Sequence, residues 1–205
     1  MTSPKGAARR EQILQTTFSA LATDGYRNTS LRGIGRLLDV EPAHILYYFD
    51  SREELLQSVV ERWDAEAVSA FGREVDPGNA LDFYVQTVRH NLEIPGIVHL
   101  YLTLAAEAVH PNHSSHGYFL ERFRTARELL GDGIRFEQKT GRIGAALDPD
   151  LEARKLIALA DGLQLQALID ASIDAPGDLA RAIETLRGGA GVPAATMLAG
   201  GGDLP

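Results

Sequence analysis

The chain has 205 residues, of which 44% are hydrophobic and 23% are charged, a composition typical of globular domains. It contains no cysteine, which excludes disulfides, thiolate zinc sites and cysteine-based redox sensing. The formal net charge is −8, but residues 1–62 hold eight basic and eight acidic side chains. The whole acidic excess therefore lies in residues 63–205, so the net charge does not exclude DNA binding by the first part.

The first residues carry basic side chains without an apolar run behind them, so we expect no secretory signal. Lys5, Arg9 and Arg10 precede the first acidic residue, and we interpret them as a basic arm. No stretch approaches the roughly 20 apolar residues that a membrane-spanning helix needs. We therefore expect a cytoplasmic protein with no membrane partner.

Two helices are predicted first. An amphipathic helix is expected over residues 9–23, with Gly25 at the position of a C-cap glycine. The second helix has Thr29 or Ser30 as its N-cap and carries its apolar side chains on one face. Across both helices these apolar side chains are Ile13, Leu14, Phe18, Leu21, Leu31, Ile34 and Leu38.

A short turn and a third helix follow. Asp39 lies in the turn, where a left-handed conformation is often needed and Asp tolerates it better than most residues. Pro42 suits the first turn of the third helix, in which Ile45 and Phe49 share a face. Two short helices joined by such a turn can place the second in a DNA major groove, although an ordinary helical hairpin has the same form.

The rest of the chain is also helical in pattern. Ser51 and Glu54 predict a capping box that opens a long linking helix over residues 51–72. Proline and glycine breaks separate further helices expected at 80–93, 97–109, 116–139, 149–172 and 178–187. With no sustained strand alternation, the predicted fold class is all-α with about nine helices. Residues 188–205, rich in glycine and small side chains, are expected to form a disordered tail.

The run GYRNTSLRGIGRLLDVEPAHILYYFDSREELLQSVV resembles the N-terminal domain of the TetR family of bacterial transcriptional regulators. The similarity covers about residues 9–60. It rests on the glycine-aromatic pair after the first helix, the Thr-Ser-x-Arg opening of the second, and the aromatic end of the third running into Ser-Arg-Glu-Glu-Leu-Leu. The resemblance implies a helix-turn-helix DNA-binding domain over residues 1–50. It also implies a larger helical domain for ligand binding and dimerisation over residues 51–187.

The resemblance also implies DNA contacts. Ser30 corresponds to a phosphate-contacting hydroxyl, Arg32 to an arginine that reaches a phosphate or a base edge, and Arg52 to a basic residue that holds a phosphate. A solvated surface role is the alternative for Arg32. The expected groove-facing residues of the third helix are Glu41, Pro42, Ala43, His44, Tyr47 and Tyr48, and packing is the alternative role for one of the tyrosines.

The recognition turn departs from the family pattern. Many relatives have Ser-Lys-Gly-Thr where this chain has Glu-Pro-Ala-His, so a lysine is lost and no operator sequence can be transferred. Glu41 could instead accept a hydrogen bond from a cytosine amino group.

The strings EAVHPNHSSHGYFLERFR and ADGLQLQALIDASID resemble the C-terminal region of one actinobacterial group of these regulators. This resemblance implies that helices near 150–172 and 178–187 pair with their symmetry mates in a homodimer, where Gly162 could allow close helix approach. The implied ligand-pocket residues are Trp63, Tyr84, Val88, Leu102, Phe123 and Gln164. Ordinary core packing would also explain each of them.

Three histidines at three-residue spacing, His110, His113 and His116, suggest a metal site. Pro111 and the polar residues around it favour a loop, in which the three rings would not share a helical face. We therefore expect solvated histidines, no metal and no cofactor.

The function favoured is a homodimeric repressor that a small-molecule effector releases from a palindromic operator in double-stranded DNA. An activator or a ligand-insensitive regulator is the alternative within the same family. A helical enzyme is disfavoured because the sequence has no glycine-rich phosphate loop, no nucleophile motif and no convincing set of metal ligands.

Overall fold

A computed structural model describes residues 4–26, 29–70 and 76–188. The part of the chain so described is all-helical, which confirms the predicted fold class, and it forms nine helices. Their bounds are α1 (Pro4–Asp24), α2 (Leu31–Leu38), α3 (Pro42–Ile45), α4 (Arg52–Ala70), α5 (Ala80–Leu92), α6 (Pro95–Glu107), α7 (His116–Lys139), α8 (Pro149–Ile169) and α9 (Ala175–Gly188). No helix among these is long and apolar enough to cross a bilayer.

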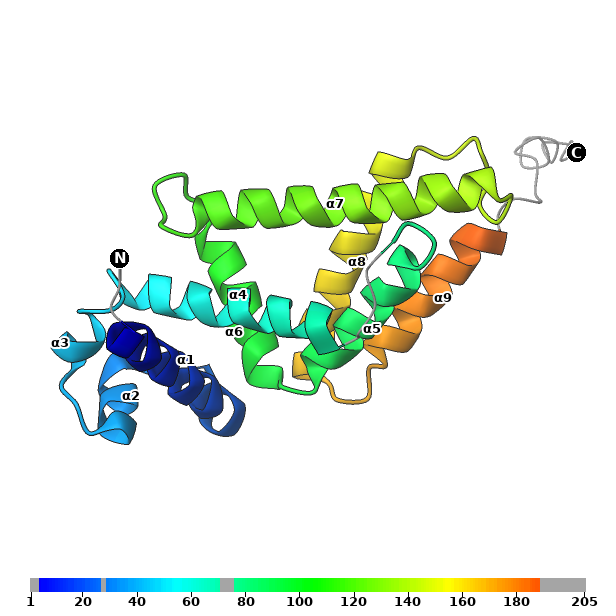
Figure 1. Ribbon diagram of the computed structural model, residues 1–205. Coiled ribbons are helices and arrows are strands. Elements are labelled where there is room, and N and C mark those ends of the chain that lie inside the picture. The colour runs from blue at the N-terminus through cyan, green and yellow to red at the C-terminus, as the bar shows by residue number, and fades with distance from the viewer. Residues whose placement is uncertain (1–3, 27–28, 71–75, 189–205) are drawn as a thin grey trace, which may run out of the picture.

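The helices form an elongated molecule with two ends (Figure 1). Helices α1, α2 and α3 gather at one end, and α5, α8 and α9 gather at the other. Helix α4 leads from the first end towards the second, and α7 runs lengthwise beside it. The chain therefore separates its helix-turn-helix segment from its C-terminal helices along one axis.

The caps of the first three helices were predicted from the sequence and are confirmed. Gly25 has a φ of 73°, and Asp39 after α2 has φ 54° and ψ 49°, the left-handed conformation expected for the turn. The Ser30 hydroxyl accepts a hydrogen bond from the Gly33 N–H at 3.1 Å and so caps α2. Pro42 is the first residue of α3. These local signals fix where the helix-turn-helix begins and ends.

The basic residues expected as an arm lie instead in the first turns of α1, which begins at Pro4 rather than near residue 9. The physical reason lies in Arg10. Its guanidinium donates to the Ser58 hydroxyl at 3.0 Å and lies 4.4 Å from the centre of the Phe49 ring. These contacts hold the start of α1 against α4.

Helix α3 is shorter than its predicted pattern, but the chain beyond it continues as helical turns. The Tyr47 N–H donates to the Ala43 carbonyl at 3.1 Å, and the Phe49 N–H donates to the Ile45 carbonyl at 3.2 Å. The two tyrosines therefore stay on the same helical spiral as the first turn of α3.

The capping box and the last helices differ from prediction in detail. The Ser51 hydroxyl accepts from the Glu54 N–H at 3.0 Å as expected, but the Glu54 carboxylate accepts from the N–H of Asp50 rather than of Ser51. Helix α8 ends at Ile169 rather than near residue 172, because Asp170 accepts from the Ser172 N–H and hydroxyl and forms a turn. The predicted tail lies outside the described residues except for Gly188, which ends α9.

Two apolar cores hold the molecule together. The first core joins α1, α2, α3, α4 and α6, and its fully buried side chains include Ile13, Leu21, Ile34, Ile45, Phe49, Leu55, Leu56, Leu100 and Leu104. The second core joins α5, α7, α8 and α9, and its fully buried side chains include Leu81, Leu130, Ile134, Leu179 and Ile183. Because the first core contains side chains from both sides of residue 50, the predicted domain boundary there stays a prediction.

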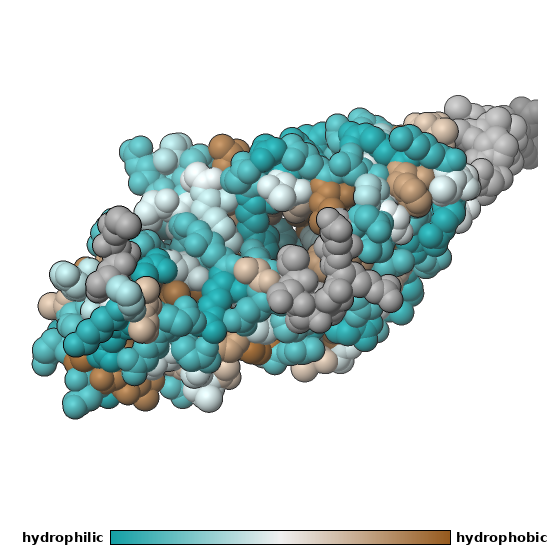
Figure 2. All heavy atoms as spheres, in the orientation of Figure 1, coloured by the Kyte–Doolittle hydropathy of each residue, from teal (hydrophilic) through white to brown (hydrophobic). Residues whose placement is uncertain are grey.

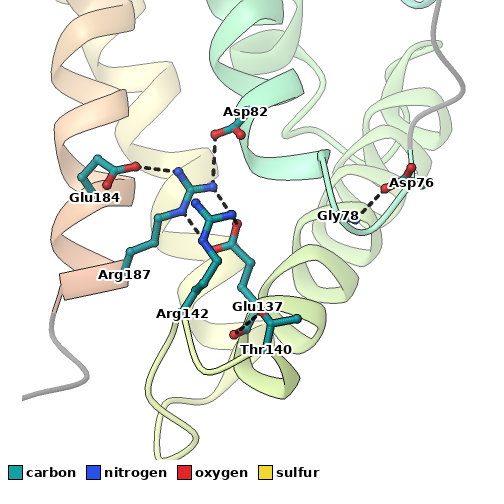
Figure 3. A network of polar contacts seen from close by, with 8 residues as sticks. All are labelled: Asp76, Gly78, Asp82, Glu137, Thr140, Arg142, Glu184 and Arg187. Carbon is teal, nitrogen blue, oxygen red and sulfur yellow. Dashed lines mark hydrogen bonds and ion pairs between the residues drawn. The ribbon is translucent and has the colours of Figure 1, made fainter.

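A cluster of charged side chains, here called the C-terminal clasp, fastens α9 to α5 and α7 (Figure 3). Its members are Asp82, Glu137, Arg142, Glu184 and Arg187. Arg187 donates to the two carboxylate oxygens of Glu137 at 2.6 and 2.8 Å, and to Asp82 at 3.1 Å. The Glu137 side chain is only 2% exposed, so its charge depends on these partners.

We predict that Arg187→Ala lowers the free energy of unfolding by about 3 kcal/mol, because it removes both short hydrogen bonds to the buried Glu137 carboxylate and leaves it with Arg142 at 3.5 Å as its cation. Urea denaturation measures the change. The matched control is Arg181→Ala on the same helix, whose ion pair with Asp178 is exposed and should matter little. Equal losses in the two variants would contradict a stabilising role for the clasp.

Candidate functional site

Two grooves flank α3 and bring most of the predicted DNA-contacting residues together. A groove of about 830 Å³, here called the turn-side groove, is lined by Ser30, Arg32, Glu41 and Pro42 among others. A groove of about 1190 Å³, here called the α1-side groove, is lined by His44, Tyr47 and Tyr48 together with the start of α1. Ala43 lies exposed on α3 between these groups.

The two tyrosines have different surroundings. Tyr47 is 80% exposed, whereas Tyr48 is half-buried and packs against the first core. The Tyr48 ring meets the ring of His44 edge-on at 5.4 Å and that of Tyr47 at 5.0 Å. Tyr48 thus packs against the core while it lines the α1-side groove, and a DNA contact stays a prediction for both tyrosines.

Ser30 and Arg52 both make hydrogen bonds within the protein. Because the Ser30 hydroxyl caps α2 as an acceptor, its own proton remains available to a phosphate oxygen. Arg52 is half-buried, lies 5.5 Å from the centre of the Tyr26 ring and donates to the Thr29 carbonyl at 3.4 Å. It ties the start of α4 to the segment before α2, and its phosphate contact stays a prediction.

Sequence reasoning missed Arg36, which is exposed and lines the turn-side groove with Arg32. Its spacing of four residues from Arg32 on one helix places both on the same face and could have identified it. Lys5 and Arg9, expected in an arm, line the α1-side groove, and no carboxylate is among the residues that line it. This groove therefore presents positive charge, as a phosphate-binding surface requires.

The predicted ligand-pocket residues lie where the two cores meet. Trp63 is buried on α4 and donates through its indole N–H to the Asn91 side chain at 2.9 Å. Asn91 in turn donates to the Gln164 side-chain oxygen at 3.4 Å, so Trp63 and Gln164 are linked across α4, α5 and α8. Phe123 packs against both cores, and Leu102 packs against the first. Val88 is fully buried in the second core, as the packing alternative implied.

Polar side chains bridge this junction beside the Phe123 ring. We call them the interior polar cluster: Asp64, Tyr84, Tyr101, Tyr118, Arg122 and Asp161. Arg122 on α7 donates twice to Asp64 on α4, at 2.8 and 3.0 Å, and Tyr118 also donates to Asp64 at 3.2 Å. Tyr101 on α6 donates to Asp161 on α8 at 3.0 Å.

The electrostatics of the cluster reflect burial. Burial raises the pKa of Tyr84 and of Tyr101 well above the usual range of a phenol. Burial also raises the pKa of Asp161, although the hydrogen bond from Tyr101 and the charge of Arg122 act in the opposite direction. Burial alone would lower the pKa of Arg122, but its bonds to Asp64 raise it overall, so Arg122 stays charged.

The cluster nevertheless faces solvent-accessible space. The side chains of Arg122 and Asp64 remain 23% and 31% exposed. Helix α7 packs along α5 and α8, whereas α4 packs on α1 and α6, so side chains of the cluster span the interval between α4 and α7. The face of the molecule seen in Figure 2 is hollowed between these two helices. We call this hollow the recess; the bonds from Arg122 on α7 to Asp64 on α4 cross the interval between the same two helices.

Comparisons with known proteins agree with this arrangement. Residues 13–59 match the family described as bacterial regulatory proteins, tetR family. The HTH-type transcriptional regulator PksA of Bacillus subtilis is 26% identical over 174 residues, which are 79% of this chain and 80% of PksA. These matches support a TetR-family transcriptional regulator with a DNA-binding helix-turn-helix.

Solved structures of TetR-like proteins share the whole fold. A putative TetR-family transcriptional regulator from Rhodococcus sp. is 24% identical and superposes with a TM-score of 0.69, covering 88% of this chain and 99% of that one. A putative transcriptional regulator from Saccharomonospora viridis, solved in complex with choline, is 25% identical with a TM-score of 0.62, covering 87% and 96%.

The three histidines of this TetR-family chain shape the loop between α6 and α7. The Nδ1 atom of His116 lies 2.8 Å from the Ala108 carbonyl, and the Nδ1 atoms of His110 and His113 accept backbone N–H groups two residues further on, each at 3.2 Å. In the described ranges, no three histidine, aspartate or glutamate side chains are grouped to hold a metal ion.

We predict that Arg32→Ala weakens operator binding about tenfold or more, because it removes either a base contact or a phosphate contact. Fluorescence anisotropy at several salt concentrations separates these cases, since loss of a phosphate contact reduces the salt dependence as well. Arg124→Ala is the control, because Arg124 is an exposed arginine on α7. An affinity that Arg32→Ala leaves unchanged would assign Arg32 to a solvated surface role.

Proposed function

We propose that the protein is a homodimeric repressor that dissociates from a palindromic operator when a small molecule binds in the recess. One observation carries the proposal: α4 physically joins the two sites. It begins beside the grooves with Arg52 and presents Asp64 to the recess about 18 Å further along its axis, at 1.5 Å per residue. A ligand that moves Asp64 would therefore move the start of α4.

In this proposal, residues 1–50 read the operator. The basic side chains around α3 hold phosphates, and the exposed first turn of α3 with Tyr47 meets base edges in the major groove. Glu41 lacks a cation partner in the described residues and is free to accept from cytosine. The remaining helices, residues 51–187, bind the ligand and dimerise.

The exposed face of α8 supports dimerisation. It carries apolar side chains at helical spacing, and these remain uncovered in a single chain: Leu151, Leu159, Leu165 and Ile169. Gly162 lies in the same row, and nothing lies within 4 Å of where a Cβ would be. A second copy packed on α8 and α9 would bury this row, and the open space at Gly162 would allow close helix approach.

The ligand is proposed to be a small organic molecule. The Saccharomonospora viridis regulator, whose fold this chain shares, was solved with choline, which supports a small-molecule effector for this chain as well. The proposal includes no enzymatic step, and the site of action is the cytoplasm, where operator DNA lies.

Repression through a palindrome predicts the outcome of selection from a random double-stranded DNA library. Retained sequences should contain inverted repeats with half-sites about 34–36 Å apart or a multiple of that, and the affinity should fall steeply as salt rises. Sequencing of the retained pool is the readout. Enrichment of single, unrepeated sites would contradict the dimeric mode, and no enrichment at low salt would contradict operator binding itself.

Dimerisation through α8 predicts that Leu165→Glu weakens self-association roughly thirtyfold or more, because it buries a charge in the proposed interface. Analytical ultracentrifugation measures the dissociation constant. Leu120→Glu, at an exposed leucine on α7, is the control and should leave association unchanged. A monomeric wild-type protein would contradict dimerisation, and equal effects of both substitutions would place the interface elsewhere.

A further inference from the structure

We propose that the recess binds an organic cation, an amine or a quaternary ammonium ion, with Asp161 as its counter-ion. The inference rests on the proposed ligand-responsive function and names the chemical class of the effector. It follows from the balance of charges in the interior polar cluster, from the surroundings of Asp161 and from the aromatic rings beside it.

The charges in the cluster do not balance. Two carboxylates, Asp64 and Asp161, face one guanidinium, that of Arg122. Arg122 gives two hydrogen bonds to Asp64, and Tyr118 adds a third, so this pair is mutually satisfied. The negative charge in excess therefore belongs to Asp161.

Asp161 lacks the cation that a desolvated carboxylate needs. Its Oδ1 atom accepts from the Tyr101 hydroxyl at 3.0 Å, and within the described residues no lysine, arginine or histidine nitrogen lies within 4.0 Å of the carboxylate. Glu137 in the C-terminal clasp is a structural carboxylate with which Asp161 can be compared. Glu137 is sealed from solvent and held by Arg187 and Arg142. Asp161 is only partly buried and has no cation in direct contact among the described residues, an arrangement that suits a ligand counter-ion.

The neighbouring rings suit a cation. Tyr84 feels the charges of both Asp161 and Arg122 and so lies beside the same two groups. Tyr101 already has the Arg122 guanidinium 4.5 Å from its ring centre, which shows that a cation is stable against the rings of this site. An anionic ligand would have to displace Asp64 from Arg122 and would leave a second carboxylate unmatched next to Asp161.

Three probes of the same shape test the sign of the ligand charge: choline, its neutral isostere 3,3-dimethylbutan-1-ol, and the anion 3,3-dimethylbutanoate. Binding to the full-length protein is measured by calorimetry and by the shift in Tm. Choline should bind and raise the Tm, and the alcohol and the carboxylate should not. This comparison needs no variant. Failure of choline to bind better than both isosteres would overturn the proposal.

Asp161→Asn then tests the counter-ion. It keeps the shape of the side chain and should weaken choline binding about tenfold or more. Asp178→Asn, at a carboxylate on α9 outside the recess, is the matched control and should bind choline like the wild type. Undiminished choline binding by a folded Asp161→Asn variant would also overturn the assignment.

Operator binding in the presence of each probe separates this inference from the proposed function. Release by the alcohol or the carboxylate, but not by choline, would keep the ligand-responsive regulator and reject the cation. If no operator is bound under any condition, the proposed function fails, while the calorimetric comparison still decides the ligand class.

Discussion

The bidentate ion pair between Asp64 and Arg122 is the interaction on which the proposed link between the recess and the helix-turn-helix depends. Each of the two apolar cores is internally continuous, but α4 belongs to the first and most of α7 to the second. At their junction, in addition to the Phe123 ring that packs against both cores, Arg122 donates to Asp64 with N–O distances of 2.8 and 3.0 Å. A close-packed apolar junction would fuse the cores into one rigid body, whereas a few directional bonds fix one geometry and leave space beside it.

The Asp64–Arg122 ion pair connects ligand binding in the recess to movement of α4. The side chains of a partly exposed ion pair can bind water or a ligand instead of each other. The pair can therefore separate at a modest cost in free energy. Helix α4 has no such freedom at its first turns, where Leu55 and Leu56 are fully buried and Arg10 and Arg52 hold it to neighbouring segments. A displacement imposed at Asp64 would therefore pass to the helix-turn-helix as a movement of the whole helix rather than be absorbed by bending. In the proposed dimer, such movements change the separation of two copies of α3.

Helix caps and turns, which depend on neighbouring residues in the chain, could be predicted from the sequence. Contacts between side chains far apart in the chain could not. Ser30, Asp39 and Pro42 each follow from rules that span a few residues, and all three are confirmed. The fold class followed from helical periodicity, and the family followed from an ungapped motif. Asp64 and Arg122 are 58 residues apart, and Tyr101 and Asp161 are 60 apart. No local pattern marks such pairs, so of the interior polar cluster the predicted pocket contained only Tyr84 and none of the charged side chains. Arg10 was interpreted as part of an arm for the same reason, because its partners Ser58 and Phe49 lie on later segments.

The central claim is that occupation of the recess changes the spacing of the DNA-reading helices. Because the chain has no cysteine, one spin label can be placed on each protomer through Leu37→Cys, at an exposed position on α2. Pulsed electron spin resonance then measures the distance between labels in the free protein, with operator DNA and with choline. We expect choline to move the distribution away from that of the operator complex, in which the recognition helices span half-sites about 34–36 Å apart or a multiple of that. A distribution that choline leaves unchanged, although choline binds, would contradict it.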